Sequence, residues 1–226
     1  MHIYDQLWQE AVTALGQGQP KLDPFLPGKA DDHRRGVSLM FRPSEAVVSR
    51  IKAFLDPLAA QFPGQYFYPP EDLHVTVVTL ISASELWENE FVDVPAFRGI
   101  VREVLGRHSA FDVEFRGITA APNAVMIQGF AGGDTLENIR RELRREFIER
   151  GFPNRLDRRY PNQAAHITAL RFCNRDADWK QLLARLAANR QTHFGETHVE
   201  TLQLVLSDWY ASAKDRRLLE EFHLTL

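Results

Sequence analysis

The sequence predicts an α+β fold made of two pseudo-symmetric lobes of mostly antiparallel sheet, with helices on their outer faces and an active-site cleft between them. Segments in which apolar and polar residues alternate, as in strands, are interleaved with segments whose apolar residues recur every three or four positions, as in helices. Both halves of the chain also show the order strand, helix, turn and strand. In each half the strand that follows the turn carries the same short motif, which indicates that the two halves meet at one site.

We expect residues 1–34 to form a helix and an irregular linker, followed by one bilobal domain over residues 35–226 with halves of about 35–110 and 111–226. The helix is predicted because apolar residues near the N-terminus recur at four-residue steps. The stretch that follows is rich in glycine and proline, which predicts irregular structure. Residues 16–35 are therefore either a linker or a lid over the site, and a linker is the simpler expectation.

The same patterns place the elements of each half. The first half is expected to contain a strand Gly36–Phe41, a helix from Pro43 and Ser44 to about Gln61, a strand Leu73–Leu80 and a helix of about Pro95–Arg107. The second half is expected to contain strands Phe111–Thr119 and Ala124–Phe130, a helix Thr135–Arg150, the second motif strand, a helix Asp178–Asn189, and a closing hairpin of Val199–Ser207 with about Leu218–Leu224. Four arginines of the Thr135–Arg150 helix are mixed with glutamates, which indicates a solvated face: Arg140, Arg141, Arg144 and Arg145.

The motif shared by the two halves is Tyr-Pro-x4-His-x-Thr. It runs from Tyr68 to Thr76 in the first half and from Tyr160 to Thr168 in the second. A third His-x-Thr begins at His223, but no Tyr-Pro precedes it and it ends one residue before the C-terminus. We interpret the third copy as a coincidence in a terminal strand. The functional signal is therefore the longer match and not the tripeptide.

Strand geometry gives the His-x-Thr spacing a reason. Side chains alternate between the two faces of a strand, so His74 and Thr76 project from the same face, as do His166 and Thr168. The positions between and after them are apolar and point to the opposite face, which a helix can cover. Each strand thus presents an imidazole beside a hydroxyl. A buried, hydrogen-bonded histidine is the alternative for either copy alone, but two matched copies favour acid–base chemistry.

Composition excludes several classes of protein. The formal charge of −3 argues against a general nucleic-acid coat, although a local basic pocket for a small nucleotide or an RNA end is compatible with it. The single cysteine, Cys173, cannot form an intramolecular disulfide, and we interpret it as a packed thiol in a reducing compartment. No signal-peptide pattern and no apolar run of about 18 residues is present. We therefore expect a cytoplasmic monomer without a membrane partner.

The paired motifs resemble the signature of the two-histidine (2H) phosphoesterase superfamily, the LigT-like group of 2′-5′ RNA ligases and RNA 2′,3′-cyclic phosphodiesterases. Its members carry one His-x-Thr/Ser-x motif in each lobe; here these run from His74 to Val77 and from His166 to Ala169. The resemblance covers roughly Arg35 to the end of the chain. It implies a cyclic phosphodiesterase that needs neither metal nor cofactor and hydrolyses 2′,3′-cyclic phosphates of RNA ends or nucleotides.

Opening a cyclic phosphate requires a base that takes a proton from water and an acid that protonates the departing ribose oxygen. Histidine suits both roles because its ordinary pKa is about 6.5. We therefore expect His74 and His166 to be catalytic, with Thr76 and Thr168 donating to the non-bridging phosphate oxygens. Metal-ligand spacings such as His-x-x-x-His or paired cysteines are absent, so no metal is expected. Which histidine acts as the base stays open.

Aromatic residues are the first group of candidates for substrate binding. Tyr68 and Tyr160 occupy matched positions before the two motifs, where each either packs a turn or contacts a phosphate or a base. Trp209, followed by Tyr210, either stacks on a base or packs in the core.

Arginines are the second group. Arg159, next to Arg158, precedes the second motif, and Arg34 and Arg35 precede the first strand. Each of these either supplies positive charge to the site or is simply solvated.

Two other functions remain as alternatives. The same histidines would serve the reverse reaction, in which a 2′-5′ RNA ligase joins two ends, but an acidic chain offers little surface for a tRNA-sized partner. A non-catalytic nucleotide- or RNA-binding module on the same fold would need no matched acid and base. Both rank below hydrolysis.

Overall fold

A computed structural model describes residues 2–91, 93–152, 156–157 and 164–225. Within them, one curled nine-stranded sheet has the order β7-β4-β5-β6-β3-β1-β8-β9, with β2 beside β6. Every pair of neighbouring strands in it is antiparallel. The strands are β1 (Arg35–Phe41), β2 (Tyr66–Phe67), β3 (Val75–Ser84), β4 (Phe111–Ala121), β5 (Ala124–Ala131), β6 (Ile167–Arg171), β7 (His193–Val199), β8 (Thr201–Ser207) and β9 (Arg217–His223).

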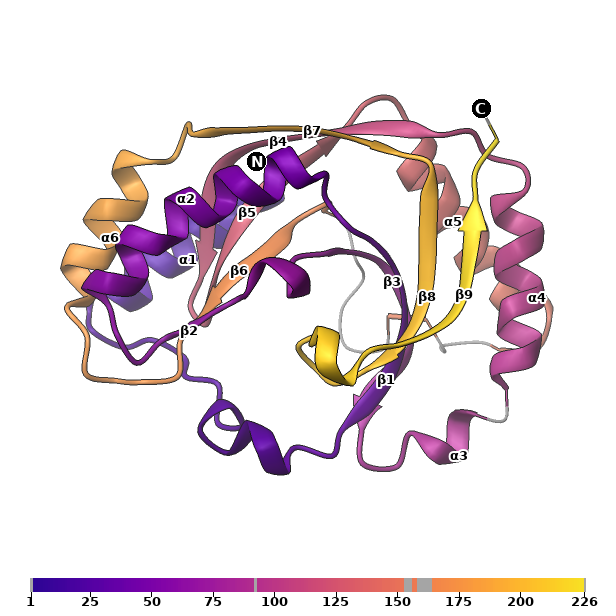
Figure 1. Ribbon diagram of the computed structural model, residues 1–226, viewed down its shortest axis with the longest axis horizontal. Coiled ribbons are helices and arrows are strands. Elements are labelled where there is room, and N and C mark those ends of the chain that lie inside the picture. The colour runs from indigo at the N-terminus through magenta and orange to yellow at the C-terminus, as the bar shows by residue number, and fades with distance from the viewer. Residues whose placement is uncertain (1, 92, 153–155, 158–163, 226) are drawn as a thin grey trace.

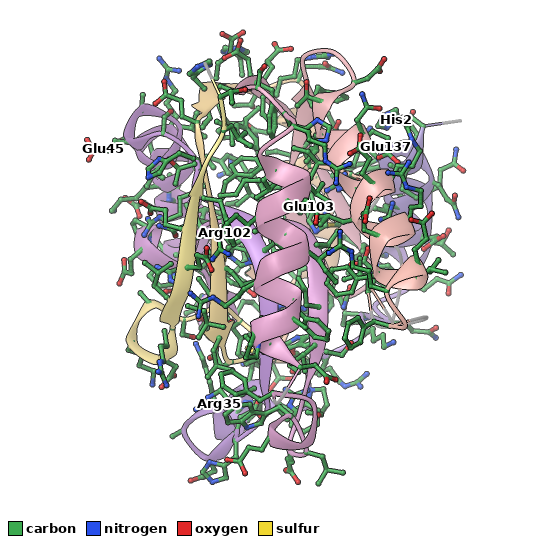
Figure 2. All side chains as sticks on the ribbon, turned by 90° about the vertical axis from the view of Figure 1, so that its right-hand side faces the viewer. His2, Arg35, Glu45, Arg102, Glu103 and Glu137 are labelled. Carbon is green, nitrogen blue, oxygen red and sulfur yellow. The ribbon has the colours of Figure 1, made fainter. Side chains whose placement is uncertain are left out.

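Helices cover the outside of this sheet. They are α1 (Ile3–Gly16), α2 (Glu45–Gln61), α3 (Glu88–Phe91), α4 (Val94–Leu105), α5 (Thr135–Glu149) and α6 (Trp179–Ala188), with short 3-10 turns η1 (Leu26–Asp31), η2 (Pro70–Asp72) and η3 (Ala213–Asp215). Figure 1 shows α1, α2 and α6 beside one half of the curled sheet and α4 and α5 beside the other. Figure 2 looks onto α4, which carries Arg102 and Glu103, between the β8–β9 hairpin and α5. The predicted α+β class is confirmed.

Local sequence signals account for the starts of α2 and α6. The Ser44 hydroxyl accepts a hydrogen bond from the Val47 amide at 3.4 Å and begins α2, and the Asp178 carboxylate accepts one from Gln181 at 2.9 Å and begins α6. The apolar stripe predicted near the N-terminus is the buried face of α1, where Ala11 is fully buried.

The two central strands, β3 and β6, have equivalent surroundings. A strand–helix–strand unit ends in each of them: β1-α2-β3 in one half and β5-α5-β6 in the other. Next along the sheet, β8 lies beside β1 and β4 lies beside β5. Because β8 and β9 come from the end of the chain, the half of the sheet that contains β1 and β3 draws strands from both ends of the sequence.

Two strands were not predicted, the two-residue β2 and the longer β7. β7 pairs with β4 at the edge of the sheet, and its sequence, HFGETHV, contains two histidines, a glutamate and a glycine. Few large apolar residues alternate in it, so the local signal is weak. Pairing with β4 and burial of Phe194 and Val199 determine its conformation.

Candidate functional site

Both His-x-Thr motifs lie where β3 meets β6. Val75 is paired directly with Ile167. In an antiparallel ladder the flanking residues oppose each other in reverse order, so His74 faces Thr168 and Thr76 faces His166. Val75 and Ile167 are completely buried on one face of the sheet, and the four polar side chains project from the other.

The neighbours of the two threonines are also equivalent. On β1, Met40 is paired with Thr76, and on β5, Met126 is paired with Thr168. Both methionines are buried, and each packs beside its threonine without competing for a hydrogen bond. The two motifs therefore occupy matched positions across the β3–β6 seam.

The four motif side chains line one cavity, with about 770 Å³ of space that includes its opening to solvent. Its floor continues along β1 and β3, where Ser38 and Ile81 lie. Tyr68, Arg171 and Trp209 line it on other sides. A single cleft thus brings together two imidazoles, several hydroxyls and a guanidinium.

One contact determines the tautomer of His74. Its Nδ1 lies 2.7 Å from the backbone oxygen of Asp72 in η2. A carbonyl oxygen only accepts, so Nδ1 carries the proton and donates it. In the neutral ring the lone pair is therefore on Nε2, the nitrogen that remains for other partners.

Burial lowers the pKa of both histidines from 6.5 to about 4. Nearby positive charge contributes to these shifts: Arg216 and Arg171 act on His74, and His74 and then Arg140 act on His166. The bond to Asp72 partly opposes the shift at His74 because it favours the charged ring. Both side chains are partly exposed within the cleft, so water there moderates the shift. Both imidazoles are accordingly neutral at pH 7.

This shift predicts a pH-dependent stability. Between pH 4 and pH 6.5 the unfolded chain binds protons that the folded chain does not, so the free energy of unfolding is expected to fall as the pH is lowered through this window. Above pH 6.5 the contribution is fully present. Urea unfolding at pH 7 and pH 5 measures it, with a His74→Gln/His166→Gln double variant as the reference. An equal loss of stability in both proteins would contradict the prediction.

The structure places the aromatic candidates in different environments. The Tyr68 side chain is buried, lines the cavity, and accepts a hydrogen bond from Arg171 Nε at 2.9 Å. Burial raises the pKa of Tyr68 to about 12. Trp209 lines the cavity, whereas the buried Tyr210 donates to Asp23 Oδ1 at 3.0 Å. Tyr160 lies outside the described residues.

The arginine candidates do not line the cavity where they are described. Arg34 forms a bidentate pair with Asp32 and stacks on Phe25, with its guanidinium carbon 3.6 Å from the ring centroid. Arg35 donates to the backbone oxygen of Asp32 at 2.8 Å. Arg158 and Arg159 lie outside the described residues. Cys173 is partly buried and donates from Sγ to the Gly64 carbonyl at 3.2 Å.

Residues 17–34, which we call the strap, contact both halves of the sheet. In Figure 1 the strap runs from the end of α1 to the start of β1. The Asp23 amide donates to the Phe172 carbonyl beyond β6 at 2.7 Å, and the Asp23 carboxylate binds Tyr210 in the β8–β9 loop. Lys29 Nζ donates to Tyr66 at 2.6 Å. These hydrogen bonds hold the strap in place beside Arg171 and Trp209, two residues that line the cavity.

Sequence reasoning missed two arginines. Arg171 ends the second motif strand and has its guanidinium carbon 5.8 Å from the ring centroids of both Trp209 and Tyr210. The sequence signal that could have identified it is a single arginine at the end of an otherwise apolar strand. Arg140 is 2 % exposed and binds backbone carbonyls, so the interpretation of its helix as a solvated face is wrong at this position. Helical spacing alone does not reveal a buried arginine.

Comparison with known proteins identifies the family. The sequence profile of the 2′-5′ RNA ligase superfamily matches residues 42–208. The chain belongs to this superfamily. The matched region contains both His-x-Thr motifs and leaves α1, the strap, β1 and β9 outside. No curated protein matches the sequence.

Solved structures of the superfamily share the fold. The crystal structure of the Thermus thermophilus protein TT0787 is 22% identical, with a TM-score of 0.53 over 84% of this chain and 97% of that one. E. coli LigT complexed with 3′-AMP is 15% identical, with a TM-score of 0.55 over 86% of this chain and 99% of that one. E. coli LigT has also been crystallised with ATP. At these identities the likeness extends to the fold alone.

Two further structural features bear on ligands and partners. Among the described residues, no cluster of three or more histidine, cysteine, aspartate or glutamate side chains is arranged to hold a metal ion. In the same part of the chain, no helix is long and apolar enough to cross a membrane.

Proposed function

We propose that the protein is a metal-independent cyclic phosphodiesterase that hydrolyses 2′,3′-cyclic phosphates of RNA ends or nucleotides. One observation carries the proposal: His74 and His166, each opposite a threonine of the other motif, line the same cavity. Two titratable groups on adjacent strands suit proton transfer on two sides of one phosphorus.

The proposed reaction divides the two proton transfers between the imidazoles. A neutral ring takes the proton of the attacking water, and the other ring, as imidazolium, donates a proton to the ribose oxygen that leaves. Both rings are neutral at pH 7, so the anionic phosphate must raise the pKa of one of them as it binds. Thr76 and Thr168 donate to the non-bridging oxygens. Which ring starts protonated depends on how the nucleotide lies in the cleft.

The ligand class is supported by the relatives and by the cavity. E. coli LigT has been crystallised with 3′-AMP, ATP and NADP+, all of which are nucleotides. In this chain Trp209 offers an aromatic wall and Arg171 a cation in the same cleft. A phosphate at the histidines with a base against that wall is therefore the proposed arrangement.

The decisive experiment is hydrolysis of the four nucleoside 2′,3′-cyclic monophosphates in excess EDTA. We expect turnover to persist in EDTA and the product to be a single 2′- or 3′-phosphate, which identifies the leaving oxygen. Activity that disappears with EDTA and returns with added metal would overturn the metal-free mechanism.

The same protein is then incubated with RNA fragments that carry a 2′,3′-cyclic phosphate and a 5′-hydroxyl. Formation of 2′-5′ bonds without hydrolysis would favour the ligase, the activity after which the superfamily is named. Nucleotide binding without either reaction would favour the non-catalytic module.

The threonine hydroxyls are expected to act on kcat. Thr76→Val and Thr168→Val each remove one donor to a phosphate oxygen while keeping the shape of the side chain, and each should lower kcat by about 10²-fold. Thr76→Ser and Thr168→Ser keep the hydroxyl and should retain most of the activity. Steady-state kinetics on the best cyclic nucleotide measure both pairs, and valine variants as active as the serine variants would exclude this role.

A further inference from the structure

The two motif strands separate immediately beyond the site. Among the described residues, β3 and β6 share the single pair Val75–Ile167, and β3 then continues to Ser84. Side chains and loop groups bind this edge of β3 instead. Arg140 Nε on α5 donates to the Val77 carbonyl at 3.0 Å. Farther along, the Asp157 carboxylate accepts from the Thr79 amide at 2.9 Å, and the Asp157 amide donates to the Thr79 carbonyl at 2.8 Å.

Arg140 reaches both motifs at once. Besides Val77, its guanidinium donates through Nη2 to the carbonyl of Thr76, at 3.2 Å, and to the carbonyl of Ala164, at 3.1 Å. Thr76 belongs to the first motif, and Ala164 lies two residues before His166 of the second. A planar guanidinium has five donors in a fixed fork, so one side chain can connect carbonyls from two segments.

The burial of Arg140 makes this connection rigid. The residue is 2 % exposed and lies on the inward face of α5 with Leu136, Leu143 and Phe147. A cation removed from water is tolerated only when polar groups compensate it, and here backbone oxygens accept hydrogen bonds from its Nε and Nη2. Its neighbour Arg141 is exposed and bonds only to Asn138 on its own helix among the described residues. Contact with the two motif segments is therefore a property of Arg140 and not of the arginines of α5 in general.

We propose that Arg140 is a positioning residue that fixes the separation and electrostatics of the two catalytic imidazoles by tying the Thr76 carbonyl to the Ala164 carbonyl. This inference rests on the proposed function. Arg140 does not line the cavity, so it acts through the backbone on either side of the seam and through its positive charge, which adds to burial and to His74 in lowering the pKa of His166. Tyr4, Glu137, Arg144 and Asp157 are the other titratable groups whose charges act on Arg140.

The first test needs no substrate. Titration of the histidine ring signals by NMR should show that Arg140→Met raises the pKa of His166, because a nearby positive charge is lost, and changes His74 less. Arg141→Met, one residue away on the exposed face, should leave both titrations unchanged. A His166 titration that is the same in Arg140→Met and the wild type would overturn the electrostatic part of the proposal.

The second test is kinetic. Arg140→Met is expected to lower kcat by about 10²-fold with little change in KM, because a small displacement of a catalytic group costs that much. The limb of the pH–rate profile that reports His166 should move as the His166 titration does, which a purely structural defect would not cause. Arg141→Met should match the wild type. Unchanged kcat in a folded Arg140→Met protein would overturn the positioning role.

Arg140→Lys covers the case in which the methionine variant does not fold. Lysine keeps the charge, but one ammonium cannot span three carbonyls in the same geometry, so the His166 titration should stay near the wild type while kcat falls. Wild-type kcat in Arg140→Lys would contradict the proposal. The two proposals can fail separately. If neither the wild type nor any variant hydrolyses a cyclic phosphate, the proposed function fails. If Arg140→Met still shifts the His166 titration in that case, the electrostatic effect of Arg140 on His166 stands.

Discussion

His74→Ala and His166→Ala are each expected to lower kcat for hydrolysis of a 2′,3′-cyclic nucleotide by about 10²–10⁴-fold. Each substitution removes one of two proton transfers, and the remaining imidazole cannot act as acid and base on opposite sides of the phosphorus. The double variant should be little worse than either single variant because the two groups act as a unit. Each single variant should also lose one limb of the bell-shaped pH–rate profile.

The third His-x-Thr provides the matched control. The His223 side chain on β9 is 75% exposed and does not line the cavity, so His223→Ala should have wild-type kinetics. Wild-type kcat in either His74→Ala or His166→Ala would contradict the two-histidine mechanism. A comparable loss in His223→Ala would indicate that histidine substitutions act through the fold.

Gly129→Ala is expected to produce the largest loss of stability. A Cβ at Gly129 on β5 would overlap the carbonyl oxygen of Ala165, and backbone on one side must move. Such overpacking costs about 1–3 kcal/mol, which lowers Tm by about 2–12 °C for a chain of this length. Ala165 precedes His166, so kcat should fall as well. Thermal unfolding followed by circular dichroism measures the first effect, and cyclic nucleotide hydrolysis well below Tm measures the second.

Gly132→Ala is the matched control for this prediction. Gly132 has the Asp112 carbonyl at ordinary contact distance, 3.6 Å from the added Cβ, and its φ is not in the left-handed region. Its Tm and kcat should stay close to those of the wild type. Equal effects of the two substitutions would show that contact with Ala165 does not matter. A stable Gly129→Ala protein with normal kinetics would show that the second motif tolerates displacement.

Much of the fold could be predicted from local patterns. The helices α1, α2, α4, α5 and α6 and the hairpin of β8 with β9 lie close to their expected bounds because their apolar periodicity and end signals are strong. The face that each motif presents was also predictable, since a period of two places His74 with Thr76 and Val75 with Val77. β7 was not predicted because its few apolar residues are mixed with histidine and glycine.

The wider site could not be predicted from these patterns. Arg171 and Trp209 meet in space from β6 and the β8–β9 loop, and no spacing in the chain indicates that contact. Arg140 looked like its exposed neighbours because helical charge patterning does not show which side of α5 faces the seam. The strap is held by bonds from Asp23 and Lys29 to residues far away in the sequence, so its composition alone did not place it.

The sequence by itself determined the class of fold, the strands that carry the two motifs and the four side chains, His74, Thr76, His166 and Thr168, which share a polar face. These follow from short-range periodicity, which the backbone geometry of helices and strands imposes. Only the tertiary structure decided that Val75 pairs with Ile167, and hence that each histidine faces the other motif's threonine. It also decided that a buried guanidinium joins the two motifs, because long-range pairing and burial depend on how the whole sheet curls.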